Sequence, residues 1–288
     1  MTSPAPSLVG RRIVVTGASR GIGEAIARHL GRLGAHVVLV ARDPAALERV
    51  RASLPGGPHG VIALDVTDEA AWTAAAGQIG AEGPLDGLVI AAGVLGPIGP
   101  PGSWQIGEFR RTIEVNLVGT LLSILSVLDP LRAGRGAVVA LSGGGATSPL
   151  PRFDAYAASK AALVRLVENM AVELAPEGVR INCVAPGFVA TAMHRATQEA
   201  GPDLVGVEYY ERTREALSAG GDSPELAAKL TAFLLSEEAG GITGRLISAR
   251  WDPWTQPAFR ERLRSDASLG RLRRIDDQFF SAAPPVAG

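Results

Sequence analysis

Short runs of apolar and β-branched residues recur along the chain and alternate with longer segments that are rich in alanine and leucine. Nearly continuous apolar runs of this length are typical of strands that lie in a parallel sheet and are buried on both faces. The pattern therefore predicts seven strands. They are expected at residues 12–16, 35–41, 60–64, 86–92, 136–141, 179–185 and 245–248.

The segments between these runs repeat their apolar positions with the period of a helix. Leu163, Val167, Met170 and Leu174, for example, fall on one stripe. Strands that alternate with amphipathic helices predict an α/β fold. The predicted fold is the Rossmann fold, in which helices cover both faces of a doubly wound parallel sheet. We expect seven strands in this sheet.

No segment has the composition of a linker between domains, so we predict one folded domain with two appendages. Residues 1–10 are expected to form a disordered leader, residues 11–250 the Rossmann-type domain, and residues 251–288 a C-terminal extension. Trp251 and Trp254 can each bury a large apolar area. We expect them to fold the extension over a cleft of the domain or against another subunit. The alternative is a disordered tail with two stray tryptophans.

Charge and cysteine content exclude several classes of protein. The net charge of −1 leaves no basic excess for nucleic-acid binding, and no stretch approaches the roughly 18 consecutive apolar residues of a membrane helix. Cys183 is the one cysteine, so we expect a core residue, no disulfide within the chain and a reducing, cytoplasmic compartment. None of the four histidines lies in a metal-ligand pattern. His194 is expected at the surface, and contact with the substrate from the lid is the alternative.

The first predicted strand runs into the sequence TGASRGIG at residues 16–23, and a helical pattern follows it. Gly17, Gly21 and Gly23 would let the backbone turn tightly and approach a pyrophosphate, which the helix N-terminus binds through its free N–H groups. A glycine pattern between a first strand and a helix therefore predicts a dinucleotide site. The alternative is a tight turn without a ligand.

The end of the second strand indicates which dinucleotide binds. A carboxylate at this point would accept a hydrogen bond from the adenosine ribose, but the chain has Ala41 and Arg42 there. Arg20 lies inside the glycine turn. Two guanidinium groups can bind a 2′-phosphate with charge-assisted hydrogen bonds, so we predict NADP(H). The alternative is that both arginines are solvated surface residues.

A candidate proton donor lies in YAASK at residues 156–160. Tyr156 and Lys160 are four residues apart, so they would share one face of a helix. The ammonium group favours the phenolate and is expected to lower the pKa of the tyrosine.

Together these motifs resemble those of the short-chain dehydrogenase/reductase family in its NADP-preferring form. TGASRGIG, LDV at 64–66, AAG at 91–93, Asn116, YAASK and NCVAPGFVAT at 182–191 follow the family's order and separations over about residues 11–248. By this resemblance, Asp65 and Val66 flank the adenine, and Thr191 binds the nicotinamide carboxamide. The implied cofactor site comprises Gly17, Ser19, Arg20, Gly21, Ile22, Gly23, Arg42, Asp65, Val66, Ala92, Gly93, Tyr156, Lys160, Pro186, Gly187, Val189 and Thr191.

The resemblance also implies a mechanism and an assembly. Tyr156 protonates the carbonyl oxygen as hydride arrives, Lys160 stabilises the phenolate and binds the nicotinamide ribose, and Asn116 holds a water in a proton relay. For Asn116, a polar residue that caps or kinks a buried helix is the alternative. A homodimer or homotetramer that forms through the helices at 106–131 and 156–175 is expected.

The hydroxyl partner of the tyrosine departs from the family pattern. The family serine, thirteen residues before Tyr156, corresponds to Gly143 in this chain. Ser142 lies one residue earlier, and Ser148 lies eight residues before the tyrosine. The run of glycines after Ser142 has the backbone freedom to re-aim its hydroxyl. We predict Ser142, at the end of the fifth strand, with Ser148 or neither serine as the alternatives.

These residues predict an NADP-dependent oxidoreductase that reduces a ketone or oxidises a secondary alcohol of a small organic molecule. An epimerase or dehydratase on the same fold and a catalytically silent NADP-binding protein are the alternatives. The replacement at Gly143 favours the silent protein, whereas Tyr156, Lys160 and Asn116 favour the enzyme. Apolar and charged residues mix in an expected lid at residues 192–222, which suits a substrate with an apolar body.

Overall fold

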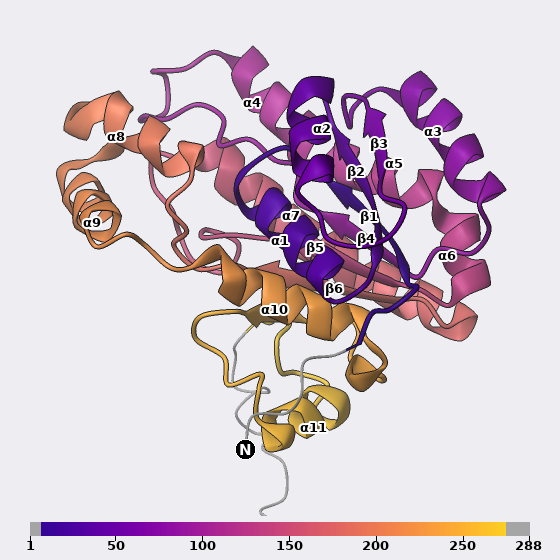
Figure 1. Ribbon diagram of the computed structural model, residues 1–288. Coiled ribbons are helices and arrows are strands. Elements are labelled where there is room, and N and C mark those ends of the chain that lie inside the picture. Colours follow the sequence, from indigo (N-terminus) through magenta and orange to yellow (C-terminus); the bar gives the residue numbers. More distant parts are fainter. Residues whose placement is uncertain (1–6, 275–288) are drawn as a thin grey trace, which may run out of the picture.

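Seven parallel strands form the sheet at the centre of the molecule, in the order β3-β2-β1-β4-β5-β6-β7 (Figure 1). The computed structural model describes residues 7–274. The strands are β1 Arg12–Thr16, β2 His36–Ala41, β3 Gly60–Ala63, β4 Gly87–Ile90, β5 Ala137–Leu141, β6 Arg180–Ala185 and β7 Leu246–Ser248. The predicted doubly wound parallel sheet of seven strands is therefore confirmed.

The apolar side chains of the strands alternate between two cores, one on each face of the sheet. Val14 of β1 pairs with Val38 of β2 and Leu88 of β4, and these three side chains belong to one core. Val15, the next residue, belongs to the other core. Val14 and Val15 are both fully buried, as near-continuous apolar runs predict.

Helices cover both faces of the sheet. One face carries α1 (Gly21–Arg32), α2 (Pro44–Ala52) and α10 (Pro224–Leu235), and Figure 1 shows α1 and α10 in front of the strands. The opposite face carries α3 (Glu69–Ala81), α5 (Gly119–Ser126), α6 (Leu128–Gly134) and α7 (Asp154–Leu174). Further helical segments are α4 Ile106–Ile113, the π-helical turn η1 Glu114–Val118, the short turns η2 Ala175–Glu177 and η3 Glu237–Ala239, α8 Ala192–Val205, α9 Val207–Ser218 and α11 Pro257–Ser265.

Two helices begin close to strand ends because an aspartate caps each of them. The carboxylate of Asp43 accepts a hydrogen bond from the backbone N–H of Ala46 at 3.0 Å, at the start of α2. Asp68 caps α3 in the same way through the N–H of Ala71 at 2.9 Å. The connections after β2 and β3 are therefore short, and the carboxyl edge of the sheet stays open.

The strand order reverses beside β1, which pairs with β2 on one side and with β4 on the other. In open α/β sheets, a crevice forms outside the carboxyl ends of the strands at such a reversal, and ligands bind there. The helices α8 and α9 project from the body on one side of this edge (Figure 1).

The C-terminal extension packs against the body through aromatic and apolar side chains. Trp254 is buried, and its ring stacks on Phe233 of α10 with the centroids 5.9 Å apart. Phe259 and Leu263 of α11 are buried in the same core. Trp251, by contrast, is 79 % exposed in the single chain and does not pack in this core, and its expected contact with another subunit stays a prediction.

Backbone contacts hold the last described residues of the extension along the sheet edge. The N–H of Leu246 in β7 donates to the carbonyl of Gly270 at 2.7 Å. The N–H of Leu272 donates to Glu168 at 2.6 Å, and its carbonyl accepts from Arg165 at 3.0 Å. The extension therefore covers the outer edge of β7 and part of α7.

The N-terminal leader ends earlier than predicted. Leu8 is 1 % exposed and packs in the core beside α1, and its N–H donates to the carbonyl of Leu33 at 3.1 Å. Residues 8–10 therefore belong to the body, because burial of Leu8 and this hydrogen bond fix them there. Residues 1–6 of the expected leader lie outside the described residues.

Within residues 7–274, no single helix is long and apolar enough to cross a membrane. The bent pair Ile106–Ser126 and Leu128–Gly134, which meets at 57°, satisfies the criteria of length and composition only. Cys183 is buried in the core, as predicted. No group of three or more His, Cys, Asp or Glu side chains in the described chain is arranged to hold a metal ion.

Candidate active site

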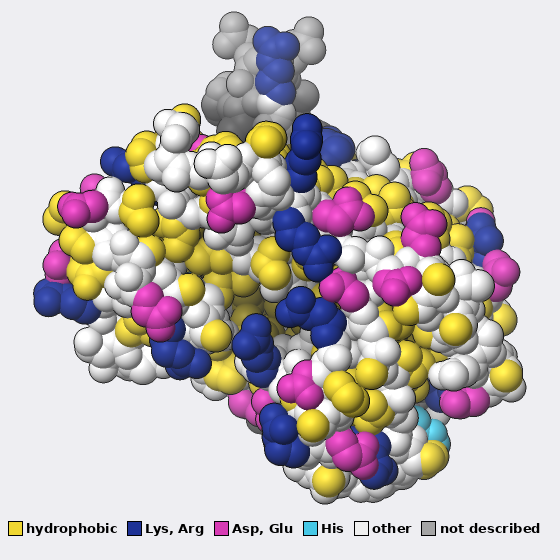
Figure 2. All heavy atoms as spheres, turned by 90° about the horizontal axis from the view of Figure 1, so that it is seen from above, with side chains coloured by type: hydrophobic (Ala, Val, Ile, Leu, Met, Phe, Trp, Pro, Cys, Tyr) yellow, Lys and Arg dark blue, Asp and Glu magenta, His cyan; other side chains and the backbone are white. Residues whose placement is uncertain are grey.

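A cavity of about 1400 Å³ runs along the carboxyl ends of the strands. Seen from above, it is a hollow with several Lys and Arg side chains around it (Figure 2). We call the part around the glycine turn 16–23 the cofactor end, and the part between Tyr156 and α8 the chemical end. The predicted site residues line this cavity, except Val189 and Asn116, which are buried outside its lining.

The glycine turn leaves room for a pyrophosphate because side chains are excluded from it. Gly17 has a φ of +66°, and a Cβ there would lie 2.6 Å from the backbone nitrogen of Ala92. A Cβ on Gly23 would lie 2.2 Å from the carbonyl oxygen of Gly17, so the turn and α1 touch backbone to backbone. Gly21 and Ile22 line the cavity where α1 begins, so the N-terminus of this helix is available to an anion.

Three exposed arginines line the cofactor end. The side chains of Arg20, Arg42 and Arg49 have no hydrogen bond or ion pair with another residue of the described chain. The carboxylate of Asp43, which also lines the cavity, is engaged as the cap of α2. Sequence reasoning identified Arg20 and Arg42 but missed Arg49. Arg49 lies on the helix that follows the second strand, and this position is the signal from which its place at the cofactor end could have been predicted.

Asp65 and Val66 line the cofactor end after β3. The carboxylate of Asp65 accepts hydrogen bonds from the N–H and hydroxyl of Thr67 at 3.0 and 2.8 Å, and from Arg111 at 2.9 Å. Burial acts to raise the pKa of Asp65, but these hydrogen bonds outweigh it, and the pKa is lowered. Arg111 of α4, which sequence reasoning also missed, thus neutralises this carboxylate.

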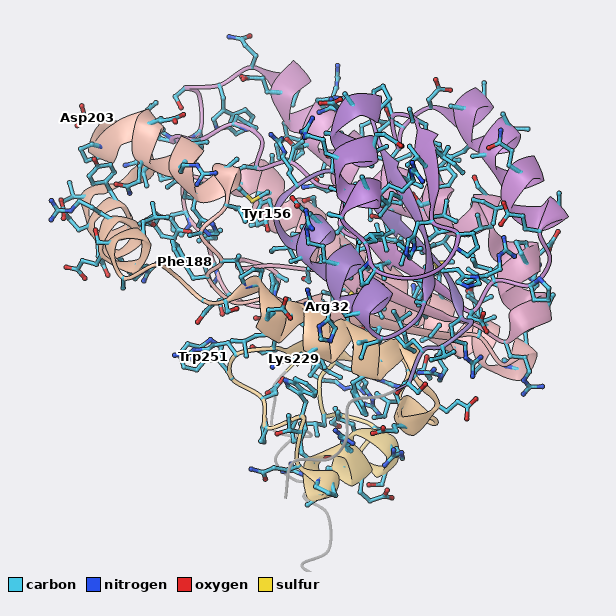
Figure 3. All side chains as sticks on the ribbon, in the orientation of Figure 1. Arg32, Tyr156, Phe188, Asp203, Lys229 and Trp251 are labelled. Carbon is cyan, nitrogen blue, oxygen red and sulfur yellow. The ribbon has the colours of Figure 1, made fainter. Side chains whose placement is uncertain are left out.

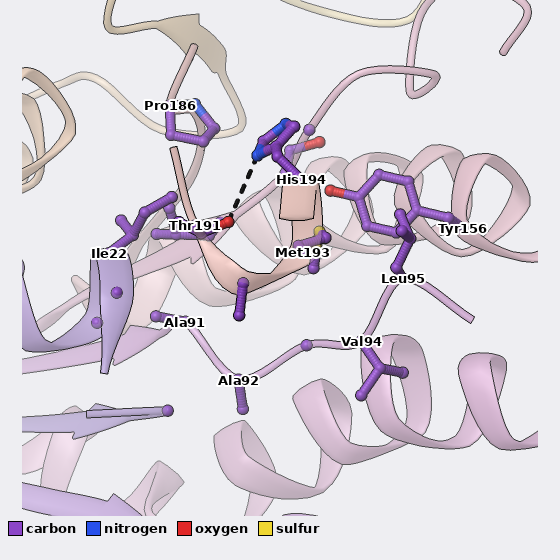
Figure 4. A pocket seen from close by; sticks show the side chains of 18 of the residues that line it. Ile22, Ala91, Ala92, Val94, Leu95, Tyr156, Pro186, Thr191, Met193 and His194 are labelled. Atoms are coloured by element: carbon purple, nitrogen blue, oxygen red, sulfur yellow. Dashed lines mark hydrogen bonds between the residues drawn. The ribbon is translucent and has the colours of Figure 1, made fainter. Parts of the chain in front are cut away.

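The chain turns at Gly187 after β6 and enters the segment that leads to α8. Gly187 has a φ of +87°, and a Cβ there would lie 2.5 Å from Asp222. The carboxylate of Asp222 accepts a hydrogen bond from the next backbone N–H at 2.8 Å and so ties this turn to the segment after α9. Thr191 lines the cavity, and its hydroxyl lies 3.4 Å from Nδ1 of His194 (Figure 4).

Tyr156 and Lys160 lie one turn apart on α7 and are both buried. The ammonium group of Lys160 donates to the carbonyl of Leu141 at 2.7 Å and lies 5.7 Å from the centre of the Tyr156 ring. Burial raises the pKa of Tyr156 to about 12 and lowers the pKa of Lys160 to about 8. The expected lowering of the tyrosine pKa is therefore wrong for this structure, because the loss of solvation raises the pKa and the nearby Tyr209 raises it further.

Asn116 lies in η1, where the helical run from α4 to α5 widens into a π-helical turn. Its Nδ2 donates to the carbonyl of Val94 and to the hydroxyl of Ser159, both at 2.9 Å. Its Oδ1 accepts a hydrogen bond from the N–H of Val94 at 2.8 Å. Asn116 thus ties the loop after β4 to α7, while its role in a water relay stays a prediction.

The two candidate serines both lie in the loop after β5 but differ in their position relative to the cavity. Ser142 lines the cavity and is 3 % exposed, and its hydroxyl has no hydrogen-bond partner in the described chain. Ser148 is exposed and lies outside the cavity lining, whereas Thr147, which sequence reasoning overlooked, lines it. Ser142 is therefore the serine at the site, and its role as the partner of Tyr156 stays a prediction.

Apolar side chains surround the tyrosine at the chemical end. Leu95, Leu150, Met193 and Tyr209 line this part of the cavity and pack in one cluster with Tyr156. Figure 4 shows the hydroxyl of Tyr156 pointing into the pocket, on the side of Met193. A phenol in this setting can donate a proton to an oxygen atom while its neighbours exclude water.

His194 also lines the chemical end, so the expectation of a surface histidine is wrong. Its ring packs against Phe188 with the centroids 4.0 Å apart, and burial lowers its pKa. Trp251 lines the cavity as well, although most of its surface is exposed. Figure 3 shows Trp251 below Phe188, projecting away from the body. The guanidinium of Arg250 lies 5.2 Å from the centre of the Trp251 ring.

Both the sequence and the fold are similar to known proteins. A family model described as Enoyl-(Acyl carrier protein) reductase matches residues 17–249. "Inactive 2-(S)-hydroxypropyl-CoM dehydrogenase 2" of Xanthobacter autotrophicus is 39 % identical, over 76 % of this chain and 95 % of the relative. "Dehydrogenase/reductase SDR family member 4" of Sus scrofa is 33 % identical, over 81 % and 84 %.

The fold comparison agrees with the sequence comparison. The crystal structure of a putative NAD(P) dependent gluconate 5-dehydrogenase from Beutenbergia cavernae with bound NADP superposes with a TM-score of 0.74. It is 30 % identical to this chain, and the match covers 84 % of this chain and 96 % of the other. The chain therefore belongs to the short-chain dehydrogenase/reductase family of oxidoreductase enzymes.

Proposed function

We propose that the chain is an NADP-dependent oxidoreductase that transfers hydride between NADP(H) and the carbonyl or secondary alcohol group of a small organic substrate. The observation that carries the proposal is the shared cavity. It joins a glycine turn and three arginines without partners in the described chain to a buried tyrosine–lysine pair. The first set of residues suits a phosphorylated dinucleotide, and the second suits proton transfer.

NADP(H) is favoured over NAD(H) by the charges at the cofactor end. An adenosine 2′-phosphate there would meet three guanidinium groups. The two carboxylates that line this end are already engaged, because Asp43 caps α2 and Asp65 pairs with Arg111. Similar solved structures hold either cofactor, NADP at low occupancy in the protein from Beutenbergia cavernae and NAD+ in a xylitol dehydrogenase, so the choice rests on the charges of this chain.

NADPH supplies the hydride when it is bound. Tyr156 gives its phenolic proton to the substrate oxygen, and the ammonium group of Lys160 stabilises the phenolate that remains. The carbonyl of Leu141 fixes the position of that ammonium group. Ser142, whose hydroxyl has no partner in the described chain, is the proposed second contact for the substrate oxygen. In the oxidative direction, Tyr156 removes the hydroxyl proton.

The surface of the helices supports a homodimer or homotetramer. Val118 of η1, Leu125 of α5 and Val172 of α7 are exposed apolar residues on segments that the sequence assigns to assembly. Burial of such residues against a second copy would remove apolar surface from water. Val172→Asp is expected to shift the oligomer toward the monomer in sedimentation equilibrium, and an unchanged mass would contradict this interface.

A catalytically silent NADP-binding protein is the second candidate, and Gly143 favours it. The position of the family serine carries no hydroxyl in this chain, and the similar protein of Xanthobacter autotrophicus has the word inactive in its name. Tyr156 and Lys160 favour the enzyme, because both lie in the cavity lining.

One assay separates the candidate functions. The chain is mixed with NADPH and a panel of ketones with apolar bodies, or with NADP and the matching alcohols, and the reduced nicotinamide is followed by absorbance. Net turnover that Tyr156→Phe abolishes would support the proposed enzyme. Product formation without net oxidation of NADPH would indicate an epimerase or dehydratase. Binding of NADPH without any turnover would indicate the silent protein.

A further inference from the structure

The phenol of Tyr156 lies directly against the backbone of Gly143, in the loop after β5. A Cβ on Gly143 would lie 2.2 Å from the phenolic oxygen, 3.1 Å from Cζ and 3.4 Å from Cε1 of the ring. Ordinary contacts between non-bonded heavy atoms begin near 3.5 Å. Any side chain at this position would therefore overlap the phenol by more than an ångström unless one of the two residues moved.

Neither partner in this contact is free to move far. The backbone before Gly143 is held to the sheet, because the N–H of Ser142 donates to the carbonyl of Val184 at 2.8 Å. On the other side, the turn of α7 that carries Tyr156 is fixed through Ser159. The Ser159 hydroxyl donates to the carbonyl of Tyr156 at 2.7 Å and accepts a hydrogen bond from Asn116 at 2.9 Å. The ring itself would have to turn away.

The three glycines at 143–145 have different surroundings. A Cβ on Gly144 would have no atom within 4 Å of it, and the backbone conformation of this residue is ordinary. Gly145 has a φ of +85°, which favours glycine for conformational reasons alone. Gly143 has an ordinary φ, so its backbone conformation does not require glycine. Glycine is required there because a side chain would collide with the phenol.

We propose that Gly143 is a positioning residue: the absence of a side chain there lets the phenol of Tyr156 sit against the end of β5, where it meets the substrate oxygen. The serine that the family pattern has at this position would displace the proton donor of this chain and would not complete its site. This inference rests on the proposed function, in which Tyr156 is the proton donor. It reinterprets Gly143 as part of an active site and not as the sign of a lost one.

The test compares Gly143→Ala and Gly143→Ser with Gly144→Ala. Both Gly143 variants are expected to lower kcat by about 10²-fold, the loss that a misplacement of roughly 1 Å causes, while the Kd for NADPH stays within about twofold. Gly144→Ala is expected to leave the phenol in place, because its methyl group meets no atom of the chain, although Gly144 lines the cavity. Gly77→Ala on α3, outside the cavity lining and equally free of contacts, is expected to keep kcat and Kd within about twofold. Thermal unfolding of each variant reports whether the fold is retained.

A crystal structure of Gly143→Ser gives a readout that does not depend on turnover. The phenolic oxygen is expected to move by roughly 1 Å or more from its place in the unmodified chain, because the serine Cβ takes that place. A Gly143→Ser variant with unchanged or increased kcat would overturn the proposal, and so would an unmoved phenol. If the unmodified chain turns over no substrate, the proposed function fails, and the position of the phenol in the variant still decides whether Gly143 positions it.

Discussion

The two ends of the cavity are built in different ways. The cofactor end is centred on one contiguous stretch, the glycine turn, in which Gly17 and Gly23 touch backbone to backbone, and side chains that follow β2 and β3 complete it. The chemical end is assembled from the end of β5, the first two turns of α7, the segment around α8 and the C-terminal extension. A site that depends on local backbone geometry is specified by a short motif. A site that depends on packing between distant segments is not specified by any single motif, and a family position in it, such as Gly143, has to be judged by its contacts.

The electrostatics of the two ends differ as well. At the cofactor end, Arg20, Arg42 and Arg49 are exposed and have no partners in the described chain, so an anion can bind them with little rearrangement. At the chemical end, Lys160 is buried and donates to a carbonyl, and its pKa is lowered to about 8. The first arrangement suits ligand binding. The second keeps a charge out of water, beside the phenol whose ionised form it is proposed to stabilise.

The largest expected effect on activity comes from Tyr156 at the chemical end. Tyr156→Phe removes the proton donor and should lower kcat by about 10²–10⁴-fold, the usual contribution of a general acid. The Kd for NADPH, measured by fluorescence titration, should change little, because the cofactor end is untouched. Loss of NADPH binding together with activity would show that the two ends are not separable.

A replacement in the C-terminal extension is expected to change the free energy of unfolding by an amount comparable to the change in activation free energy at Tyr156. Trp254 is buried against Phe233, so Trp254→Ala should lower the free energy of unfolding by about 3–5 kcal/mol, as other buried Trp and Phe truncations do. Trp251→Ala is the matched control. With 79 % of its surface exposed, it should change stability by less than about 0.5 kcal/mol. Urea unfolding measures both, and equal losses would contradict the packing described here.

The same contrast explains what could be predicted from the sequence. The sheet, the glycine turn and the spacing of Tyr156 and Lys160 depend on local periodicity, and they lie where they were expected. The burial of Leu8, the position of His194 and the different exposures of Trp251 and Trp254 depend on which distant segments meet, which no local pattern records. The pKa of Tyr156 moved against expectation for the same reason, because desolvation is set by the whole surroundings.

Ser142 is expected to have the next largest effect. Ser142→Ala should lower kcat by about 10²–10³-fold if its hydroxyl holds the substrate oxygen, the loss seen when one such donor is removed. Ser148→Ala should matter much less, because Ser148 is exposed outside the cavity lining. Turnover at saturating NADPH measures both variants. A greater loss for Ser148→Ala would mean that the site is misplaced, and no loss for either would leave Tyr156 as the lone hydroxyl donor.

At the cofactor end, single replacements should have smaller effects that depend on the cofactor. Arg42→Ala removes one charge-assisted contact to a 2′-phosphate, which is worth about 1.5–3 kcal/mol, or roughly tenfold to hundredfold in the Kd for NADPH. The Kd for NADH should stay nearly constant. Arg262→Ala on α11 is the charge-matched control, since Arg262 lies outside the cavity lining. Equal weakening of both cofactors by Arg42→Ala would refute the NADP assignment.

The smallest effect on activity is expected from a change of pH, which gradually removes the proton of Lys160. Because its pKa is about 8 in the folded chain, the ammonium form that stabilises the phenolate is lost as pH rises through 8. The value of kcat/KM for NADPH, which reports the free enzyme, should therefore fall about tenfold per pH unit above this point. A bound anionic cofactor favours the charged lysine, so the fall in kcat should occur at higher pH.

Stability should change in the opposite direction in the same range. The pKa of Lys160 is below its ordinary value of 10.5, so the unfolded chain binds this proton more tightly than the folded chain does. Its cost to stability is full below pH 8 and is relieved as pH rises toward 10.5. Between pH 8 and 9, below the ordinary pKa of the Cys183 thiol, the unfolding free energy should rise relative to Lys160→Met while kcat/KM falls. If both quantities fall together, unfolding and not the titration of Lys160 limits activity at high pH.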